Sequence, residues 1–218
     1  MNLIYSPEED SYLLSKVLEK EIPNLLSKNL DLTFLEIGSG SGIQLKTALK
    51  LGIKKQNIFS CDINPAAVEH CRTLRFSSEA IKKIAVPQRK GKLSGPKDKG
   101  VSFGEENRRL SRGFNCVYSD LFENIKSKYD LIIFNPPYLP EDSQEPKDSK
   151  ISTTGGEKGS EIINEFLKQA KNHLNENGKI FLLTSSLTKE INFLDYNKNI
   201  LEKKKLFFEE LFVWELNL

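Results

Sequence analysis

Residues 35–42 read Leu-Glu-Ile-Gly-Ser-Gly-Ser-Gly, a short apolar run that stops at a glycine-rich turn. Glycine adopts backbone angles that other residues avoid, and it lets a ligand approach the main chain closely. The apolar run Leu32 to Ile37 predicts a buried parallel strand, and Gly42 to Leu51 predicts the helix that follows it, ended by Gly52. A glycine-rich turn between such a strand and helix lies where doubly wound sheets bind ligands.

The spacing of these glycines separates two classes of cofactor. In the dinucleotide-binding pattern G-x-G-x-x-G the third glycine would fall at Ile43. The chain instead has G-x-G-x-G, the form typical of S-adenosylmethionine enzymes; a tight turn without a ligand is the alternative for this motif alone. Asp62 ends the next predicted strand, where its carboxylate could accept hydrogen bonds from ribose hydroxyls, and Asp120 follows the third, where it could meet an adenine amino group. Each aspartate, taken singly, could also be only a strand-end cap.

Strands and helices alternate along the rest of the chain, which predicts βαβ units and a mostly parallel sheet. The further expected elements are a strand Asn57 to Cys61, a helix from Asn64-Pro65 to about Arg75, strands Phe114 to Tyr118 and Asp130 to Phe134, a helix Glu157 to Leu174, a strand Lys179 to Thr184, a short helix and a strand near Leu211 to Leu216. An N-terminal helix is expected to begin at Ser6-Pro7, with a capping box from Ser6 to Glu9, and to be broken at Pro23. Residues 197–218 are expected to form a terminal antiparallel hairpin.

The length of 218 residues and the hydrophobic fraction of 38% suit one α/β domain spanning residues 1–218. No apolar run approaches the roughly 20 residues of a membrane helix, and the acidic Glu8-Glu9-Asp10 is unlike a signal peptide. The three cysteines, Cys61, Cys71 and Cys116, form no C-x-x-C pair and suit neither a disulfide framework nor a zinc site. A cytoplasmic protein without a metal site is therefore expected.

Basic charge is concentrated in one segment. The net charge is +2, yet residues 82–113 hold ten Lys or Arg and three Asp or Glu, a local balance of +7 that leaves 2 − 7 = −5 for the rest. This distribution argues against a nucleic-acid-binding face across the whole domain. Residues 77–113 are interpreted as a flexible insertion, either a solvated loop without a partner or a place of nucleic-acid contact.

The sequence Asn135-Pro136-Pro137-Tyr138 follows the strand Asp130 to Phe134. Proline fixes φ and lacks an N–H, so this loop is stiff. The nitrogen of an amide or aromatic amine is a poor nucleophile because its lone pair is delocalised. The side-chain oxygen of Asn135 and the carbonyl of Pro136 are expected to accept hydrogen bonds from such a nitrogen, which orients its lone pair and stabilises developing positive charge. Tyr138 offers a flat face to a planar substrate; a proline-rich turn that merely ends a strand is the alternative.

These motifs together resemble the HemK-like protein glutamine N5-methyltransferases, which modify the GGQ glutamine of peptide-chain release factors. The motifs that carry the resemblance are Tyr5-Ser6-Pro7-Glu8-Glu9-Asp10-Ser11, Leu35 to Gly42, Asp62-Ile63-Asn64-Pro65, Ser119-Asp120-Leu121-Phe122, Asn135 to Tyr138 and Gly155-Gly156-x-x-Gly159. The P-x-E-D-S start is similar to the short archaeal and eukaryotic branch. The resemblance implies the Rossmann-like, seven-stranded, mostly parallel sheet of the class I SAM-dependent methyltransferases, with a C-terminal antiparallel hairpin.

The resemblance also implies a cofactor, a set of site residues and partners. S-adenosyl-L-methionine is the implied cofactor, with contacts from Ser11, Glu36, Gly38, Gly40, Asp62, Asp120 and Leu121. The substrate amide would be held by Asn135, Pro136 and Tyr138. The implied partners are a release factor as substrate and a small zinc-binding activator subunit that covers apolar surface and extends the sheet. The insertion precedes the strand expected at the sheet edge, so it either covers that edge or contributes to docking.

Two other functions compete with this hypothesis. Methylation of an exocyclic amine in RNA or DNA would also use N-P-P-Y, although little chain remains for a nucleic-acid recognition domain. A non-catalytic cofactor-binding scaffold is disfavoured by the intact N-P-P-Y. Among the remaining residues, His70 and His173 are expected at the surface or in packing, while Trp214 and the pair Phe207-Phe208 are expected in the core, with partner contact as the alternative.

Overall fold

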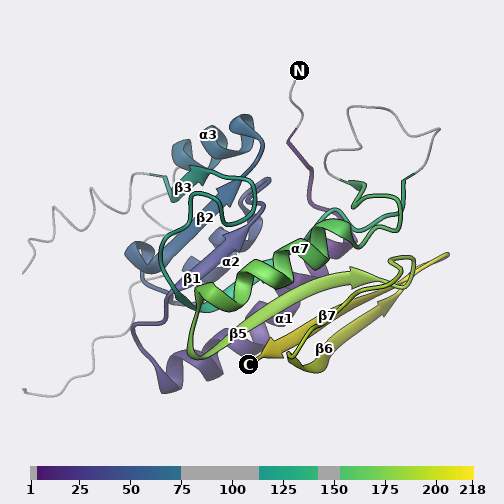
Figure 1. Cartoon of the computed structure of the whole chain (residues 1–218). Helices are drawn as coiled ribbons and strands as arrows, with labels where there is room; N and C mark the ends of the chain where they lie inside the picture. Colours follow the sequence, from purple (N-terminus) through teal and green to yellow (C-terminus); the bar gives the residue numbers. More distant parts are fainter. Residues whose placement is uncertain (1–3, 75–112, 142–152) are drawn as a thin grey trace, which may run out of the picture.

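The computed structural model describes residues 4–74, 113–141 and 153–218, so nearly all of the predicted insertion lies outside the described residues. The strands are β1 (Phe34–Ile37), β2 (Ile58–Asp62), β3 (Asn115–Tyr118), β4 (Tyr129–Phe134), β5 (Leu174–Ser185), β6 (Asn197–Lys205) and β7 (Glu210–Asn217). They form one seven-stranded sheet in the order β3-β2-β1-β4-β5-β7-β6 (Figure 1). The first five strands pair in parallel, and β7 runs antiparallel to β5 and β6. The predicted fold class and the terminal hairpin are confirmed.

The helices are α1 (Glu9–Lys28), α2 (Ile43–Lys50), α3 (Pro65–Thr73) and α7 (Glu161–Ala170), with short 3-10 turns η1 (Lys55–Asn57) and η2 (Lys171–His173). Figure 1 shows α7 on one face of the sheet and α1 on the other. Asn64 caps α3 as predicted, because its side chain accepts a hydrogen bond from the Ala66 N–H at 3.0 Å. No helix within the described ranges is long and apolar enough to cross a membrane.

Two apolar layers hold the helices against the sheet. Because side chains alternate along a strand, Leu131 and Ile133 of β4 join the core under α1, α2 and α3, whereas Ile132 and Phe134 join the core under α7. These central strands are covered on both faces, which is why they read as continuous apolar runs rather than as alternating ones. Because β1 pairs in parallel with both β2 and β4, the carboxyl ends of these three strands lie at the same end of the sheet, here called its carboxyl edge.

The N-terminal helix differs from the expectation at both ends. It begins at Glu9 with no side-chain cap, so the predicted capping box is wrong, and Pro23 lies inside it rather than ending it. An interior proline costs about 3 kcal/mol. The helix buries Leu14, Leu18 and Ile22 completely, and each such side chain is worth about 1.5–3 kcal/mol. Apolar packing therefore outweighs the lost backbone hydrogen bond, and Pro23 is left on the exposed side.

The second half of the chain differs from four further expectations. The helix expected over Glu157 to Leu174 spans only α7 and the turn η2, and residues 186–196 hold turns instead of the expected short helix. Trp214 is half-buried, and its indole N–H donates to Thr184 Oγ1 at 2.9 Å. Phe207 and Phe208 are 99% and 94% exposed at the tip of the β6–β7 hairpin, so their assignment to the core is wrong. A pair of aromatic residues in sequence gave no indication that they occupy a turn.

Candidate active site

The glycine-rich turn joins β1 to α2 at the carboxyl edge of the sheet. Gly38, Gly40 and Gly42 all have positive φ, at 74°, 45° and 69°, a region that other residues enter only at a cost. The N–H groups of Gly38 and Ser39 both donate to the carbonyl of Cys61 at 2.8 and 3.0 Å, which fastens the turn to the end of β2. A Cβ built on Gly40 would meet no atom within 4 Å. The turn therefore leaves open space at its centre, as a ligand-binding turn requires.

Asp62 is part of the framework of this turn. One carboxylate oxygen accepts the Gly40 N–H at 2.9 Å and the other accepts the Asn64 N–H at 2.8 Å. The strand-end capping role considered from sequence is thus present. A carboxylate has about four acceptor positions, so these bonds leave capacity for ribose hydroxyls, and the predicted cofactor contact stays a prediction.

Glu36 lies on β1 next to the turn and is almost completely buried. Burial, with smaller contributions from Cys116 and Asp62, raises the pKa of its carboxyl group well above the usual value. Its Oε2 atom is buried without a hydrogen-bond partner within the described part of the chain. A buried polar atom left unpaired is costly, so Glu36 fits a residue whose partner is supplied by a bound ligand.

The turn Ser119-Asp120-Leu121 lies beside the end of β2. The Ser119 N–H donates to the carbonyl of Asp62 at 3.1 Å, and the Cys61 thiol contacts the carbonyl of Leu121 at 3.3 Å. Leu121 has φ 44°, a left-handed conformation that is strained for a leucine. Asp120 is exposed. The structure therefore brings Asp120 and Leu121 next to the Asp62 region, as the predicted adenosine site requires.

Asn135 directly follows β4, at the same edge of the sheet. Its side-chain Nδ2 donates to Asp10 Oδ2 at 2.9 Å, whereas its Oδ1 is buried and has no hydrogen-bond partner among the residues described. Asp10 also accepts the Tyr5 hydroxyl, 3.0 Å from each carboxylate oxygen. Tyr5 and Asp10 lie in one of the motifs that carry the family resemblance, and no role was predicted for either. A contact between positions 125 residues apart leaves no trace in local sequence patterns.

The start of α1 is also tied to the cofactor turn. Gln44, in the first turn of α2, donates its side-chain N–H to the carbonyl of Ser11 at 2.8 Å and accepts the Ser15 hydroxyl at 2.8 Å. Ser11 is buried. These hydrogen bonds hold the start of α1 against α2, the helix that follows the glycine turn. The cofactor contact of Ser11 stays a prediction.

The loop Gly155 to Gly159 packs so closely against the N-P-P-Y backbone that side chains at Gly155 and Gly159 would clash with it. A Cβ on Gly155 would lie 2.5 Å from the carbonyl oxygen of Pro137, and one on Gly159 would lie 2.4 Å from that of Tyr138. The hydroxyl of Thr188 donates to the same Tyr138 carbonyl at 2.9 Å. Residues from two other loops therefore fix the backbone of Tyr138. Burial first, then the charges of nearby acids, raises the pKa of Tyr138 above its ordinary value, so it remains a neutral phenol.

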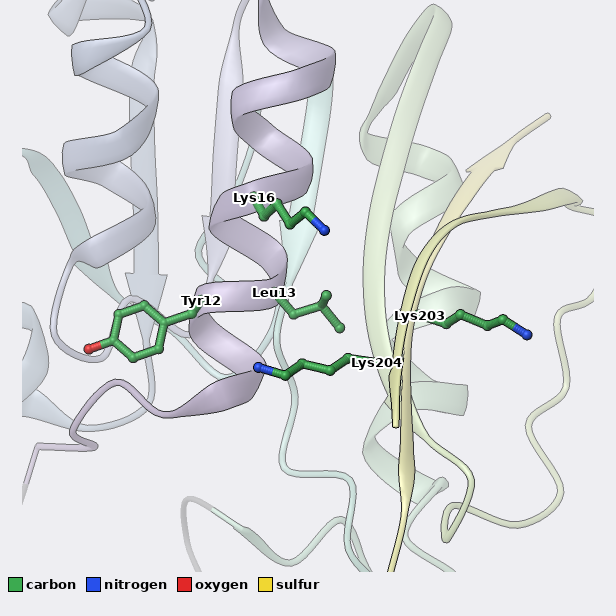
Figure 2. A pocket seen from close by; sticks show the side chains of 5 residues that line it. All are labelled: Tyr12, Leu13, Lys16, Lys203 and Lys204. Atoms are coloured by element: carbon green, nitrogen blue, oxygen red, sulfur yellow. The ribbon is translucent and has the colours of Figure 1, made fainter. Parts of the chain in front are cut away.

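A separate hollow of about 340 Å³ lies between α1 and β6 and is lined by Tyr12, Leu13, Lys16, Lys203 and Lys204 (Figure 2). Its lysines are already paired with carboxylates: Lys16 with Glu202, Lys203 with Glu210 and Lys204 with Glu9. None of the predicted site residues lines it. This hollow is therefore no part of the site at the carboxyl edge.

An open glycine turn, acidic residues at the carboxyl ends of β1 and β2, and a stiff N-P-P-Y loop after β4 define a class I SAM-dependent methyltransferase. The Eco57I restriction-modification methylase model matches residues 56–209. A protein of Methanocaldococcus jannaschii named as a protein N5-glutamine methyltransferase is 35% identical over 98% of this chain and 92% of its own. The eRF1 methyltransferase catalytic subunit mtq2 of Schizosaccharomyces pombe is 25% identical over 85% of this chain and 74% of its own.

One solved structure agrees with these matches at the level of the fold. The E. cuniculi Mtq2–Trm112 complex has a TM-score of 0.61 at 22% identity, over 99% of this chain and 98% of that one. The chain belongs to the methylases that the matching model describes and, more narrowly, to the protein N5-glutamine methyltransferases. The family resemblance read from the motifs is confirmed, and so is S-adenosyl-L-methionine as the cofactor.

Proposed function

We propose that this protein transfers the methyl group of S-adenosyl-L-methionine to the side-chain amide of the GGQ glutamine of a peptide-chain release factor. The observation that carries this proposal is the Asn135 carbonyl oxygen, a buried acceptor without a donor among the described residues. A primary amide has two N–H groups and needs such acceptors. The names of the relatives, protein N5-glutamine methyltransferase and eRF1 methyltransferase catalytic subunit, support the same substrate class.

The proposed chemistry requires orientation rather than a strong base. Bound S-adenosylmethionine supplies a methyl group already activated by its sulfonium. Asn135 Oδ1 and the Pro136 carbonyl accept the N–H groups of the glutamine amide, which turns the nitrogen lone pair toward that methyl and stabilises positive charge developing on nitrogen. The new N–C bond forms as the C–S bond breaks, and the nitrogen then releases one proton to water. Tyr138, held by two other loops, forms the flat wall beside the amide.

A small activator subunit is part of the proposal. β3 is an edge strand of the sheet, and its large apolar side chains Val117 and Tyr118 are 37% and 51% exposed. Ile63, directly after the neighbouring strand β2, is 49% exposed. An exposed edge strand with apolar side chains is suited to pairing with another chain. The solved complex of Mtq2 with Trm112 is a precedent for such an assembly. Zinc in the activator and a cytoplasmic location, where translation terminates, belong to the same proposal.

Methylation of an exocyclic amine in nucleic acid is the second candidate. It is favoured by the match of residues 56–209 to a restriction-modification methylase model and by the basic segment 82–113. The N-P-P-Y loop would present the same acceptors to an aromatic amine. The two candidate functions differ in the macromolecule that receives the methyl group, so an experiment that locates a labelled methyl group distinguishes them.

In the test, the protein is incubated with S-adenosylmethionine labelled in its methyl group and with one of four substrates. These are purified release factor, a release factor whose GGQ glutamine is replaced by alanine, total RNA, and DNA, each with and without a small zinc-binding activator. We expect label only on the release factor that retains its glutamine. Label on nucleic acid with none on release factor would reject the proposal.

Asn135→Ala is expected to lower kcat about 100- to 1,000-fold with cofactor affinity preserved. Asn24→Ala, on the exposed face of α1, is the control and is expected to leave kcat unchanged.

A further inference from the structure

The side-chain amide of Asn135 can occupy its place in two orientations that differ only in exchanging nitrogen and oxygen. Only one of them presents a carbonyl oxygen to a substrate amide; the other presents an N–H₂ group, which would oppose the substrate's own N–H donors. An ionised carboxylate only accepts hydrogen bonds. Asp10 Oδ2 lies 2.9 Å from Asn135 Nδ2, so the carboxylate selects the orientation in which Oδ1 faces away from it.

Asp10 is itself held firmly enough to make this choice. Its side chain is buried, and its oxygens accept the Tyr5 hydroxyl at 3.0 Å and the Ser11 N–H at 2.5 Å. Burial, together with the charge of Asp10, raises the pKa of Tyr5 above its ordinary value, so the phenol stays protonated and remains a donor. The Tyr5 hydroxyl and the Ser11 N–H thus fix the Asp10 carboxylate that Asn135 contacts.

The geometry points to Asp10 as a positioning residue that sets the Asn135 amide in its acceptor orientation, with Tyr5 as its support. This inference rests on the proposed function, because it assumes that Asn135 accepts a hydrogen bond from the methylated group. It explains why Asn135 Oδ1 is the atom left without a partner while Nδ2 is satisfied. The residues from Tyr5 to Glu8 precede α1 without being helical, and this run brings the Tyr5 hydroxyl against Asp10.

The test is a double-mutant cycle between positions 10 and 135, measured with the full chain and its activator on release factor. In Asp10→Asn, the new amide accepts or donates equally well, so Asn135 loses its preferred orientation. We expect kcat to fall about 10- to 100-fold, the value of a hydrogen bond to a charged group, with KM for cofactor unchanged. Tyr5→Phe removes the supporting hydroxyl and is expected to lower kcat about 3- to 10-fold. In an Asn135→Ala background, Asp10→Asn should have no further effect on kcat.

Glu9→Gln is the matched control, since Glu9 is an exposed acid on the preceding residue, paired with Lys204, and its replacement should leave kcat unchanged. Unchanged kcat in Asp10→Asn, or an equal loss with and without Asn135, would overturn the inference. Urea unfolding of the wild type, Asp10→Asn, Asn135→Ala and the double variant supplies a readout that needs no substrate. Non-additive changes in the free energy of unfolding support the contact, and additive changes overturn it. If the wild-type protein places no methyl on release factor, the proposed function fails, and the unfolding cycle still decides whether Asp10 and Asn135 interact.

Discussion

Replacing Glu36 with glutamine should stabilise the protein at neutral and higher pH while weakening cofactor binding. Glu36 is 5% exposed, and its Oε2 has no hydrogen-bond partner in the described structure. An unpaired buried acceptor costs about 1–3 kcal/mol, and more when it is charged. Glutamine keeps the shape of the side chain and removes the charge, so a gain of about 1–3 kcal/mol is expected at about pH 8, or roughly 2–4 °C in Tm per kcal/mol for a chain of this size.

The raised pKa of Glu36 determines the direction in which stability changes with pH. The pKa of Glu36 is raised in the folded state, whereas it is about 4.3 in the unfolded chain. Above pH about 4.3 the folded state therefore holds more protons than the unfolded state, and the stability of the wild type falls as pH rises through the raised pKa. The advantage of Glu36→Gln should be small near pH 4 and should widen as the pH increases, because glutamine does not titrate.

Urea unfolding across this pH range measures the difference, and calorimetric titration with S-adenosylmethionine measures the affinity, which we expect to drop about tenfold. Glu176→Gln, at an exposed position on β5, is the control and should change stability by less than about 0.5 kcal/mol. A Glu36→Gln protein that is less stable than the wild type at high pH would refute the interpretation of Glu36 as a buried carboxyl group whose partner is a bound ligand. A stability difference that does not vary with pH would refute it equally.

Three further predictions follow from particular contacts. Asp62→Ala removes acceptors for the N–H groups of Gly40 and Asn64, so it should lower both cofactor affinity in calorimetry and stability, the latter by roughly 1.5–3 kcal/mol; unchanged affinity would contradict the adenosine placement. Gly42→Ala places a Cβ 2.7 Å from the Leu74 side chain at φ 69°, and a loss of at least about 1–2 kcal/mol is expected in urea unfolding. Burial raises the pKa of Tyr196 to about 12, so wild-type stability should fall as pH rises from about 10 toward that value; Tyr196→Phe should flatten this fall, and an unchanged slope would contradict it.

The central sheet could be predicted closely because its strands are buried on both faces. The apolar runs ending at Ile37, Cys61 and Phe134 each lie within a residue or two of an observed strand end. The turn signals after them, glycines in one case and prolines in another, mark the carboxyl edge with little ambiguity. Strand positions could be predicted where local composition and tertiary burial favour the same structure.

The errors lie where a distant contact overrides a local signal. Proline at position 23 is tolerated because the opposite side of α1 packs on the sheet, and that packing is invisible in the sequence around it. The capping box expected from Ser6 to Glu9 is absent. The residues directly on either side of it, Tyr5 and Asp10, are hydrogen-bonded to each other, and Asp10 also holds the Asn135 side chain. Phe207 and Phe208 looked like core residues, yet they occupy a hairpin tip.

The motifs named individual residues of the candidate site, but they did not predict how those residues contact one another. The residues around the glycine turn and the N-P-P-Y loop were named from motifs, and the structure brings them to one edge of the sheet. What the motifs could not show is how each group is held: Asp62 by the backbone of the turn, Asn135 by Asp10, and Tyr138 by Thr188 and the Gly155 to Gly159 loop. These contacts join segments far apart in the chain.

The most direct measurement is tandem mass spectrometry of release factor after incubation with this protein, S-adenosylmethionine and an activator subunit. Fragment ions locate a methyl group on a single side chain, so they distinguish the amide of the GGQ glutamine from every other acceptor. The account predicts one methyl on that glutamine, absent when Asn135→Ala replaces the wild type. A methyl found only on another residue, or an equal yield from Asn135→Ala, would contradict it.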